Sequence, residues 1–357
     1  MNLLIITDYW INSDGGGVRE YTKNLVGALK SENIIVKVLF RRGFDTENYK
    51  LHFNKLQFII DAFKILNKEA PDVILCQGGW FGIIPALIYK IKCKNVKTLY
   101  LFHTHIDKKF HFIIKIFLEN LLNSFDHVGF VSNSLCNEII NEIGLNIKSK
   151  TFVLYAGVER KDPKDEELAE FKLNYNLSNK FILLGQALTA NYGKKEGAKL
   201  LISTLKDIIK KYPNVRLMLT RKGIYENELK SYADSLGLSE YVIFTGDLKN
   251  PNIATAICDI YTHITYGEGG LSLSVLEAMS FGKAIIASDI GGIPEALSNK
   301  QSGLLVSNDI NSIYNSIVLL IEDKTFANTL GNNANNSVKH KFTWKKTVSN
   351  LMFQLNS

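Results

Sequence analysis

The residues with the clearest capacity for chemistry lie in the stretch 259–297. There, an apolar run is followed by Glu268, Gly269 and Gly270, and then by a helical pattern. Glycine lets backbone N–H groups approach a ligand closely, and the start of a helix adds the positive end of its dipole. This turn therefore predicts an anion site of the kind that holds a pyrophosphate.

Glu277 lies about two turns into the predicted helix, in the run VLEAM. A carboxylate accepts two hydrogen bonds at once, so it can hold the adjacent 2′- and 3′-hydroxyls of a ribose. The alternative is an ion-paired or solvated glutamate, and the apolar neighbours argue against a solvated face. A second glycine pair, Gly291 and Gly292, predicts another tight strand-to-helix turn beside the first.

A third glycine cluster, Gly15, Gly16 and Gly17, follows the first strand-like run and precedes a helical pattern. It is not a dinucleotide fingerprint, because Glu20 stands where the last glycine of G-x-G-x-x-G would be. It is not a Walker A loop either, since no Gly-Lys-Ser/Thr follows. The cluster is either a second anion site or a simple turn.

Composition limits the class of protein. The chain has 357 residues, 46% hydrophobic and 22% charged, which is typical of a folded protein with two domains. A net charge of +7 is too small for a nucleic-acid binder, so no nucleic-acid partner is expected. Five of these charges fall in residues 1–160, which leaves open either a lysine-rich composition or an anionic partner for that half.

The four cysteines are scattered without metal spacing, which favours a reducing compartment. The N-terminus carries no basic leader, and the longest apolar runs are too short to span a bilayer. We therefore expect a cytoplasmic protein, or one that is peripheral on the inner face of a membrane.

Short apolar runs alternate with helical patterns in two series, which predicts an α/β protein with parallel sheets. The strand-like runs of the first series are residues 2–7, 35–40, 72–76, 98–102, 127–132 and 151–155. Those of the second series are residues 181–185, 215–220, 241–246, 259–265, 284–288 and 303–307.

A charged stretch, residues 159–172, separates the two series and reads as a linker with a polar helix. We expect one α/β domain over residues 1–160 and a second over residues 161–340. Residues 341–357 are expected to form a last amphipathic helix that packs back toward the N-terminal domain. Ligands of such sheets bind at the carboxyl ends of the strands.

Several motifs together resemble glycosyltransferase family 4. The array E-G-G-L-x-L-x-V-L-E-A-M-x-x-G-K from Glu268 is followed by A-S-D-x-G-G-I-P-E and S-G-L-L-V. Agreement extends along the chain to the GGG loop, His103 and His105, VSNSL, LYAGVE, GAKLLI and FTW. The resemblance implies the GT-B fold, with two Rossmann-like parallel-sheet domains facing a central cleft. It also implies that residues 1–160 form the acceptor-binding domain and residues 161–340 the nucleotide-sugar-binding domain.

The resemblance also implies a retaining hexosyltransferase that needs neither metal nor cofactor, consistent with the lack of any Asp-x-Asp sequence. The donor would be a nucleoside-diphosphate sugar, with UDP favoured over GDP. The acceptor would be a glycan or a lipid-linked molecule of cell-surface polysaccharide synthesis. Catalytic roles are implied for His103, Glu268 and Lys195. Donor contacts are implied for Gly15, Gly16, Gly17, His105, Gln186, Lys194, Gly269, Gly270, Leu271, Ser272, Leu273 and Glu277.

The sequence departs from the family pattern at three places. Glu268 and Glu277 stand nine positions apart instead of eight. Gln186 replaces the usual arginine, and Glu196 stands where a lysine is usual, so Lys194 or Lys195 must reach the diphosphate. These changes leave open a catalytically silent partner protein, and an epimerase or phosphorylase is a further alternative.

The stretch 108–122 begins with basic residues and continues with apolar ones. The favoured interpretation is a helix buried in the N-terminal core. The alternative is contact with an anionic membrane surface, which would bring the enzyme to a lipid-linked acceptor.

Overall fold

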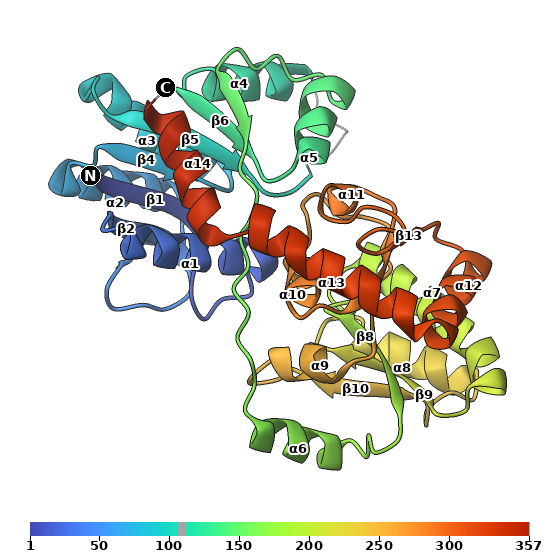
Figure 1. The fold of residues 1–357 in the computed structure, drawn as a ribbon. Helices are drawn as coiled ribbons and strands as arrows, with labels where there is room; N and C mark the ends of the chain where they lie inside the picture. Colours follow the sequence, from blue (N-terminus) through green and yellow to red (C-terminus); the bar gives the residue numbers. More distant parts are fainter. Residues whose placement is uncertain (106–111, 357) are drawn as a thin grey trace. The chain divides into compact units, whose positions relative to one another are not determined.

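Two parallel β-sheets organise the chain, one in each of its two units (Figure 1). The computed structural model describes residues 1–105 and 112–356. The first unit combines Met1–Gly157 with Trp344–Ser357, and the second is Val158–Thr343. The pair of sheets confirms the predicted α/β class with two parallel-sheet domains.

The sheet of the first unit has seven strands in the order β3-β2-β1-β4-β5-β6-β7. The strands are β1 (Asn2–Tyr9), β2 (Ile35–Arg42), β3 (Tyr49–Lys50), β4 (Val73–Cys76), β5 (Lys97–Phe102), β6 (His127–Phe130) and β7 (Lys150–Val153). The helices are α1 (Gly16–Ser31), α2 (Lys55–Glu69), α3 (Trp80–Lys92), α4 (Phe112–Leu122), α5 (Asn133–Asn137) with a π-helical turn (Glu138–Glu142), and α14 (Trp344–Asn356).

The sheet of the second unit has six strands in the order β10-β9-β8-β11-β12-β13. The strands are β8 (Phe181–Gln186), β9 (Val215–Thr220), β10 (Val242–Gly246), β11 (Ile260–His263), β12 (Ala284–Ser288) and β13 (Leu304–Val306). The helices are α6 (Asp165–Asn174), α7 (Tyr192–Lys211), α8 (Glu226–Ser235), α9 (Asn252–Ile257), α10 (Leu273–Ser280), α11 (Ile293–Ala296), α12 (Ile310–Glu322) and α13 (Lys324–Lys341).

The strand order reverses once in each sheet, between β1 and β4 and between β8 and β11. At such a switch point the loops after the two central strands diverge and leave a crevice where ligands bind. In the second unit these loops follow Gln186 and His263. The topology therefore places both predicted donor-binding segments of this unit at the same edge of its sheet.

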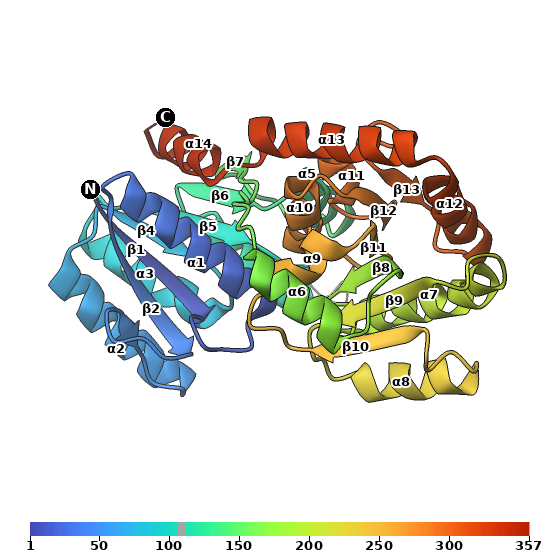
Figure 2. The ribbon, with the colours of Figure 1, turned by 60° about the horizontal axis from the view of Figure 1, so that its bottom comes forward.

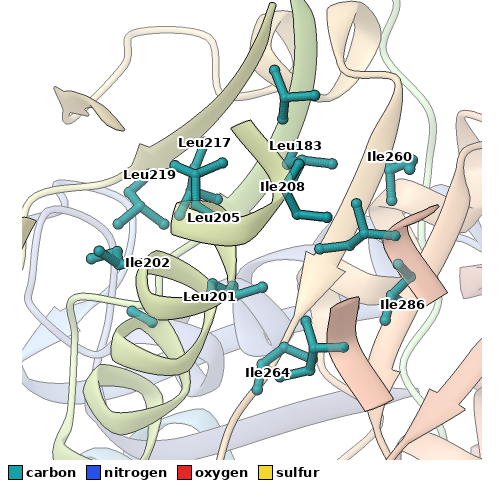
Figure 3. Packing of buried hydrophobic residues seen from close by; sticks show 14 of the residues in the cluster. Leu183, Leu201, Ile202, Leu205, Ile208, Leu217, Leu219, Ile260, Ile264 and Ile286 are labelled. Atoms are coloured by element: carbon teal, nitrogen blue, oxygen red, sulfur yellow. The ribbon is translucent and has the colours of Figure 1, made fainter. Parts of the chain in front are cut away.

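The core of the second unit packs α7 against the central strands. Figure 3 shows Leu201, Leu205 and Ile208 of α7 near Leu183 and Leu217 of the sheet. These side chains are almost fully buried, and each such burial stabilises the fold by about 1.5–3 kcal/mol. Strands covered on both faces are apolar throughout, which is why the runs were recognisable in the sequence.

The last helix, α14, belongs to the first unit and lies beside α1 (Figure 2). The rings of Trp344 and Tyr21 meet edge to face with their centroids 5.4 Å apart. Thr347 donates a hydrogen bond from Oγ1 to the carbonyl of Tyr155 over 2.9 Å. The chain thus completes its second unit before the final helix returns to the first.

Helix α4 exposes most of its apolar side chains. Within its described residues only Leu122 is fully buried, whereas Phe112 is 72% and Ile113 is 68% exposed. The favoured prediction of a helix buried in the N-terminal core is therefore wrong for the described part of this segment. Residues 108–111 of the same stretch lie outside the described residues. Among the described helices, none is long and apolar enough to cross a membrane.

Candidate functional site

A cluster of three charged or polar side chains lies at the switch point of the second sheet. Glu268 Oε2 accepts a hydrogen bond from His263 Nε2 over 3.0 Å and lies 3.3 Å from Lys194 Nζ. The side chains of Glu268 and Lys194 are only 15% and 17% exposed, and His263 is fully buried. Three separate segments, the end of β11, the loop after it and the start of α7, thus converge on one carboxylate.

The electrostatics of the cluster keep Glu268 ionised. Burial raises the pKa of this carboxyl, but the Lys194 ammonium and the His263 hydrogen bond outweigh burial and lower the pKa to about 2. Burial lowers the pKa of His263, so this imidazole is neutral and its Nε2–H donates to the carboxylate. Glu268 is therefore a fixed anion with one cationic and one neutral partner.

The position of Lys194 is set by the first turn of α7. Asn191 caps this helix, because its Oδ1 accepts a hydrogen bond from the Lys194 backbone N–H over 3.0 Å. The backbone N–H of Tyr266 donates to the carbonyl of Gly193 over 3.1 Å, which joins the helix start to the loop that carries Glu268. A helix cap and a backbone hydrogen bond therefore hold the two segments that carry Lys194 and Glu268.

A second hydrogen-bond network holds the beginning of the same loop. Asn308 donates from Nδ2 to the carbonyl of Thr265 over 2.8 Å and accepts from Ser288 Oγ over 2.5 Å. Ser288 Oγ in turn accepts from the Thr265 backbone N–H over 2.9 Å. Thr265 and Ser288 are buried, so these bonds satisfy groups that water cannot reach.

The predicted glycine turns pack directly against each other. A Cβ on Gly291 would lie 1.7 Å from the carbonyl oxygen of Glu268, and one on Gly292 would lie 2.5 Å from that of Gly270. Gly291 also has a φ of +55°, which disfavours any other residue. Gly291 and Gly292 are therefore required by the loop that carries Glu268 and Gly270. A larger residue at either position would displace that loop.

The loop leads into α10, which begins later than the glycine pattern indicates. The sequence pattern places the helix directly after Gly270, whereas α10 begins at Leu273 with Ser272 as its N-cap residue. Ser272 has a φ of +57°, a conformation that a non-glycine residue rarely adopts. Gly269, Gly270 and Leu271 therefore lie in the loop before the helix. Glu277 is half-buried on α10.

The structure separates the two candidate lysines. Lys195 Nζ lies 3.0 Å from a carboxylate oxygen of Glu196 and 3.0 Å from one of Glu228. These hydrogen bonds raise the pKa of Lys195, and the bond to Glu196 has the larger effect. Lys195 Nζ also lies over the rings of Tyr192 and Tyr225. The contact with Glu268 thus belongs to Lys194, and Lys195 links α7 to α8.

Gln186 ends β8 and is buried, with 9% exposure. Its Oε1 has no hydrogen-bond partner among the described residues. A buried polar atom without a partner costs free energy, so such atoms tend to be reserved for a ligand or water. Gln186 therefore offers a free acceptor at the switch point, where the family pattern places a cationic donor.

The predicted residues of the first unit line the carboxyl edge of its own sheet. Gly15, Gly16 and Gly17 lie where the loop after β1 enters α1, and Gly16 has a φ of +56°. A Cβ on Gly15 would lie 2.3 Å from the side chain of Tyr9, so glycine is required there. Among the described residues, nothing lies within 4 Å of the position that a Cβ on Gly17 would take.

His103 and His105 follow β5 and line a cavity of about 940 Å³ in the first unit. Burial lowers the pKa of His103 to about 3, and its buried Nε2 has no partner among the described residues. The His103 ring meets the ring of Tyr21 edge to face. His105 pairs through Nδ1 with the buried carboxylate of Glu138. His103 thus offers a neutral ring, and the ring of His105 is held by the carboxylate of Glu138.

The part of the chain that the structure describes contains no evident metal site. There, no three histidine, cysteine or acidic side chains gather as a metal-binding group. Metal independence stays a prediction from the resemblance.

Sequence reasoning missed three parts of this arrangement: His263, Asn308 and Glu138. His263 is a single polar residue within a strand-like run, and such a residue carries no spacing signal. Asn308 and Glu138 reach their partners from segments 43 and 33 residues away. Only the folded chain brings these pairs together.

The two halves of the chain match two family models. Residues 15–162 match the model described as Glycosyltransferase Family 4, and residues 187–337 match the model described as Glycosyl transferases group 1. An uncharacterized glycosyltransferase of Methanocaldococcus jannaschii is 25% identical, with 98% of this chain and 96% of the relative covered.

Two further relatives carry more specific descriptions. A GDP-mannose-dependent phosphatidylinositol monomannoside mannosyltransferase of Mycolicibacterium smegmatis is 24% identical over 60% of this chain and 58% of its own. A capsular polysaccharide biosynthesis glycosyltransferase of Staphylococcus aureus is 23% identical over 93% of this chain and 85% of its own.

The solved structure of the Anabaena protein HepE in complex with UDP has the same fold. Its TM-score is 0.81 at 18% identity, and the whole of each chain is covered. Fold and family models together define a glycosyltransferase of the GT-B type. Within that class, the chain belongs to glycosyltransferase family 4.

Proposed function

We propose that the protein is a retaining, metal-independent hexosyltransferase. It would move a sugar from a nucleoside-diphosphate sugar, most simply a UDP-sugar, to a glycan or lipid-linked acceptor in cell-surface polysaccharide synthesis. The observation that carries the proposal is the Lys194–Glu268–His263 cluster at the switch point of the second sheet. The capsular polysaccharide relative and the UDP complex of HepE support the donor class and the pathway.

The donor would bind to the second unit. Glu277 on α10 would accept hydrogen bonds from the ribose hydroxyls, and the loop amides of Gly269 and Gly270 would face the diphosphate. Lys194 would neutralise the charge that develops on the leaving diphosphate, because its ammonium is already held in place. Glu268 would then be released to accept hydrogen bonds from hydroxyls of the donor sugar.

The transfer would proceed on one face of the sugar. The bond between the anomeric carbon and the diphosphate oxygen breaks, and a bond from the acceptor oxygen forms on the same side. The acceptor proton passes to the leaving diphosphate oxygen, so no protein base is required. His103 stays a predicted catalytic residue, and the loop amides of Gly15–Gly17 stay predicted donor contacts.

Peripheral contact with the cytoplasmic face of a membrane is part of the proposal. The exposed apolar side chains of α4 and the excess positive charge of residues 1–160 support it. Purified protein should bind vesicles that contain anionic lipid at low salt and dissociate as salt rises, because the electrostatic part of the attraction is screened. Absence of binding at low salt would remove this part.

The donor class is tested by a thermal-shift panel of UDP, GDP, ADP, CDP and dTDP, each with and without EDTA. A ligand at 100 times its dissociation constant stabilises the folded state by about 2.7 kcal/mol, which raises the melting temperature measurably. A shift with one nucleotide that survives EDTA supports metal-free donor binding. Absence of any shift would favour the alternative of a catalytically silent partner protein. That alternative is motivated by Gln186, which stands where the family pattern has an arginine.

Retention is tested on the product. With an α-linked donor and a simple hexoside acceptor, proton NMR of the new glycosidic linkage should show the α configuration. A β-linked product would reject retention. Epimerised donor without acceptor, or phosphate-dependent cleavage of a glycan, would favour the remaining alternatives.

A further inference from the structure

The cavity of the first unit has a polar end and a long apolar wall. The polar end holds Asp8, His103 and His105, at the carboxyl ends of β1 and β5. The apolar wall is formed by two helices, with Ile83 and Ile84 from α3 and Ile114, Phe117, Leu118 and Leu121 from α4. Of these residues the proposed transfer uses only His103, and the apolar wall has no part in it.

The α4 side of the wall is a regular helical face. Ile114, Phe117, Leu118 and Leu121 recur at the i, i+3, i+4 and i+7 positions that share one side of a helix. Ile114 and Phe117 are 52% and 53% exposed although they line the cavity. A helix normally buries such a stripe against protein, so this one leaves apolar surface available to a ligand.

The polar end is held in place by buried partners. Arg41 Nε and Nη2 lie 2.5 and 3.0 Å from the two carboxylate oxygens of Asp8, which fixes and neutralises that side chain. Glu138 orients the ring of His105 through Nδ1. The buried Nε2 of His103 has no partner among the described residues, so it is open to a hydroxyl group.

The size of the cavity agrees with one bound molecule that uses both ends. About 940 Å³ lies at the upper end of the range for small-molecule sites. A sugar alone would leave the wall of α3 and α4 in contact with water. A molecule with a hydroxylated head and a hydrocarbon chain can hydrogen-bond at the polar end and pack against the apolar wall.

We infer that this cavity binds an amphiphilic acceptor, with its hydroxylated head at His103 and His105 and its hydrocarbon chain along α3 and α4. This inference rests on the proposed function, because it specifies the acceptor of that reaction. The neighbouring side chains Phe112 and Ile113 continue the apolar surface of α4 outside the cavity and are exposed. The apolar surface of α4 thus extends beyond the residues that line the cavity.

The experiment measures binding of n-alkyl β-D-glucosides to the full chain by calorimetry, at concentrations below micelle formation. Affinity should rise with each methylene, by up to about fourfold for a fully buried group, until the wall is covered. Glucose itself should show no measurable binding. Affinities that do not depend on chain length would overturn the inference.

Substitutions on α4 separate the cavity from general surface binding. Phe117→Ser and Ile114→Ser remove apolar lining from half-exposed positions, where folding should tolerate a polar residue, and each should weaken octyl glucoside binding about tenfold or more. Ile113→Ser is the matched control, because Ile113 is exposed on the same helix and does not line the cavity. An equal loss in the control would indicate non-specific adsorption and overturn the inference.

Nucleotide binding, measured on the same preparations, distinguishes failure of the amphiphilic acceptor from failure of the transferase proposal. If UDP or another nucleotide shifts the melting temperature but chain length has no effect, the donor assignment stands and the amphiphilic acceptor is rejected. If chain length matters but no nucleotide binds, the transferase proposal fails and the acceptor role fails with it. Phe117→Ser should leave the nucleotide shift unchanged, because Phe117 lies outside the proposed donor site, and its melting temperature without ligand reports whether the variant is folded.

Discussion

His263 Nε2 donates a hydrogen bond to Glu268 Oε2 over 3.0 Å from a position that solvent does not reach. His263 is the last residue of β11, so its ring is held by the sheet, whereas Glu268 belongs to the loop that follows. This hydrogen bond therefore holds the loop carboxylate of Glu268 in place against the rigid strand. Lys194 lies 3.3 Å from the same oxygen, so the neutral donor and the cation share one acceptor atom.

This relationship predicts that His263 acts on the reaction through Glu268. His263→Leu removes the hydrogen bond and keeps an apolar side chain in the strand. Because hydrogen bonds to charged groups contribute about 1.5–3 kcal/mol, we expect turnover of the donor to fall about tenfold or more. Nucleotide affinity should change little, since His263 contacts neither phosphate nor ribose in the proposed arrangement.

His127→Leu is the control for that variant. His127 is a buried strand histidine of the first sheet, outside the proposed donor site. A similar loss of turnover in both variants would mean that His263 contributes only to folding.

The two adjacent lysines should differ sharply. Lys194→Ala removes the cation beside Glu268, and we expect the affinity for the nucleoside diphosphate to fall about 10- to 150-fold. Lys195→Ala breaks contacts with Glu196 and Glu228 instead, so it should lower the melting temperature and leave nucleotide affinity nearly unchanged. Calorimetric titration and thermal melts of both variants provide the test, and the reverse ranking of affinities would contradict the assignment.

The glycine pair that supports the Glu268 loop allows a steric test. In Gly292→Ala the new Cβ would meet the carbonyl oxygen of Gly270 at 2.5 Å, so the loop must move and donor binding should weaken. Gly27→Ala in α1 is the matched control, because nothing lies within 4 Å of its Cβ position. In that helix interior alanine should stabilise by up to about 1 kcal/mol. Equal nucleotide affinity in the wild type and in Gly292→Ala would contradict the packing argument.

The buried imidazoles predict loss of stability in mild acid. Burial lowers the pKa of His103 to about 3, below the ordinary value of 6.5, so between these pH values the unfolded chain binds a proton that the folded chain does not. Stability therefore falls as pH drops through this window, by at most about 1.4 kcal/mol per pH unit for one group. His263 shifts in the same direction, and Glu268, with a pKa of about 2 against 4.5, adds a similar loss at lower pH.

His103→Asn isolates one of these groups. Thermal melts at pH 7.5 and pH 5.0 should show a smaller drop in melting temperature for the variant than for the wild type. The difference between the two pH values is the readout, so a constant destabilisation by the substitution cancels. Identical pH dependence of both proteins would show that His103 is accessible to protons in the folded state.

Much of the fold was evident in the sequence for a simple physical reason. Strands buried on both faces of a parallel sheet are continuous apolar runs, and the two series of such runs correspond to the observed strands apart from the two-residue β3. The glycine-rich loops and Glu277 were also recognisable, because glycine spacing and a family motif are local properties of the chain.

Tertiary structure decided which side chains act together. The sequence offered Lys194 or Lys195 for the diphosphate, with the catalytic role given to Lys195. Helix geometry directs adjacent residues about 100° apart, so Lys194 reaches Glu268 and Lys195 reaches Glu228. The sequence also left α4 open between a buried and an exposed helix, and its packing settled that choice. His263 became a functional candidate only when the end of β11 met the loop of Glu268, since a hydrogen bond depends on distance in space and leaves no periodic signal in sequence.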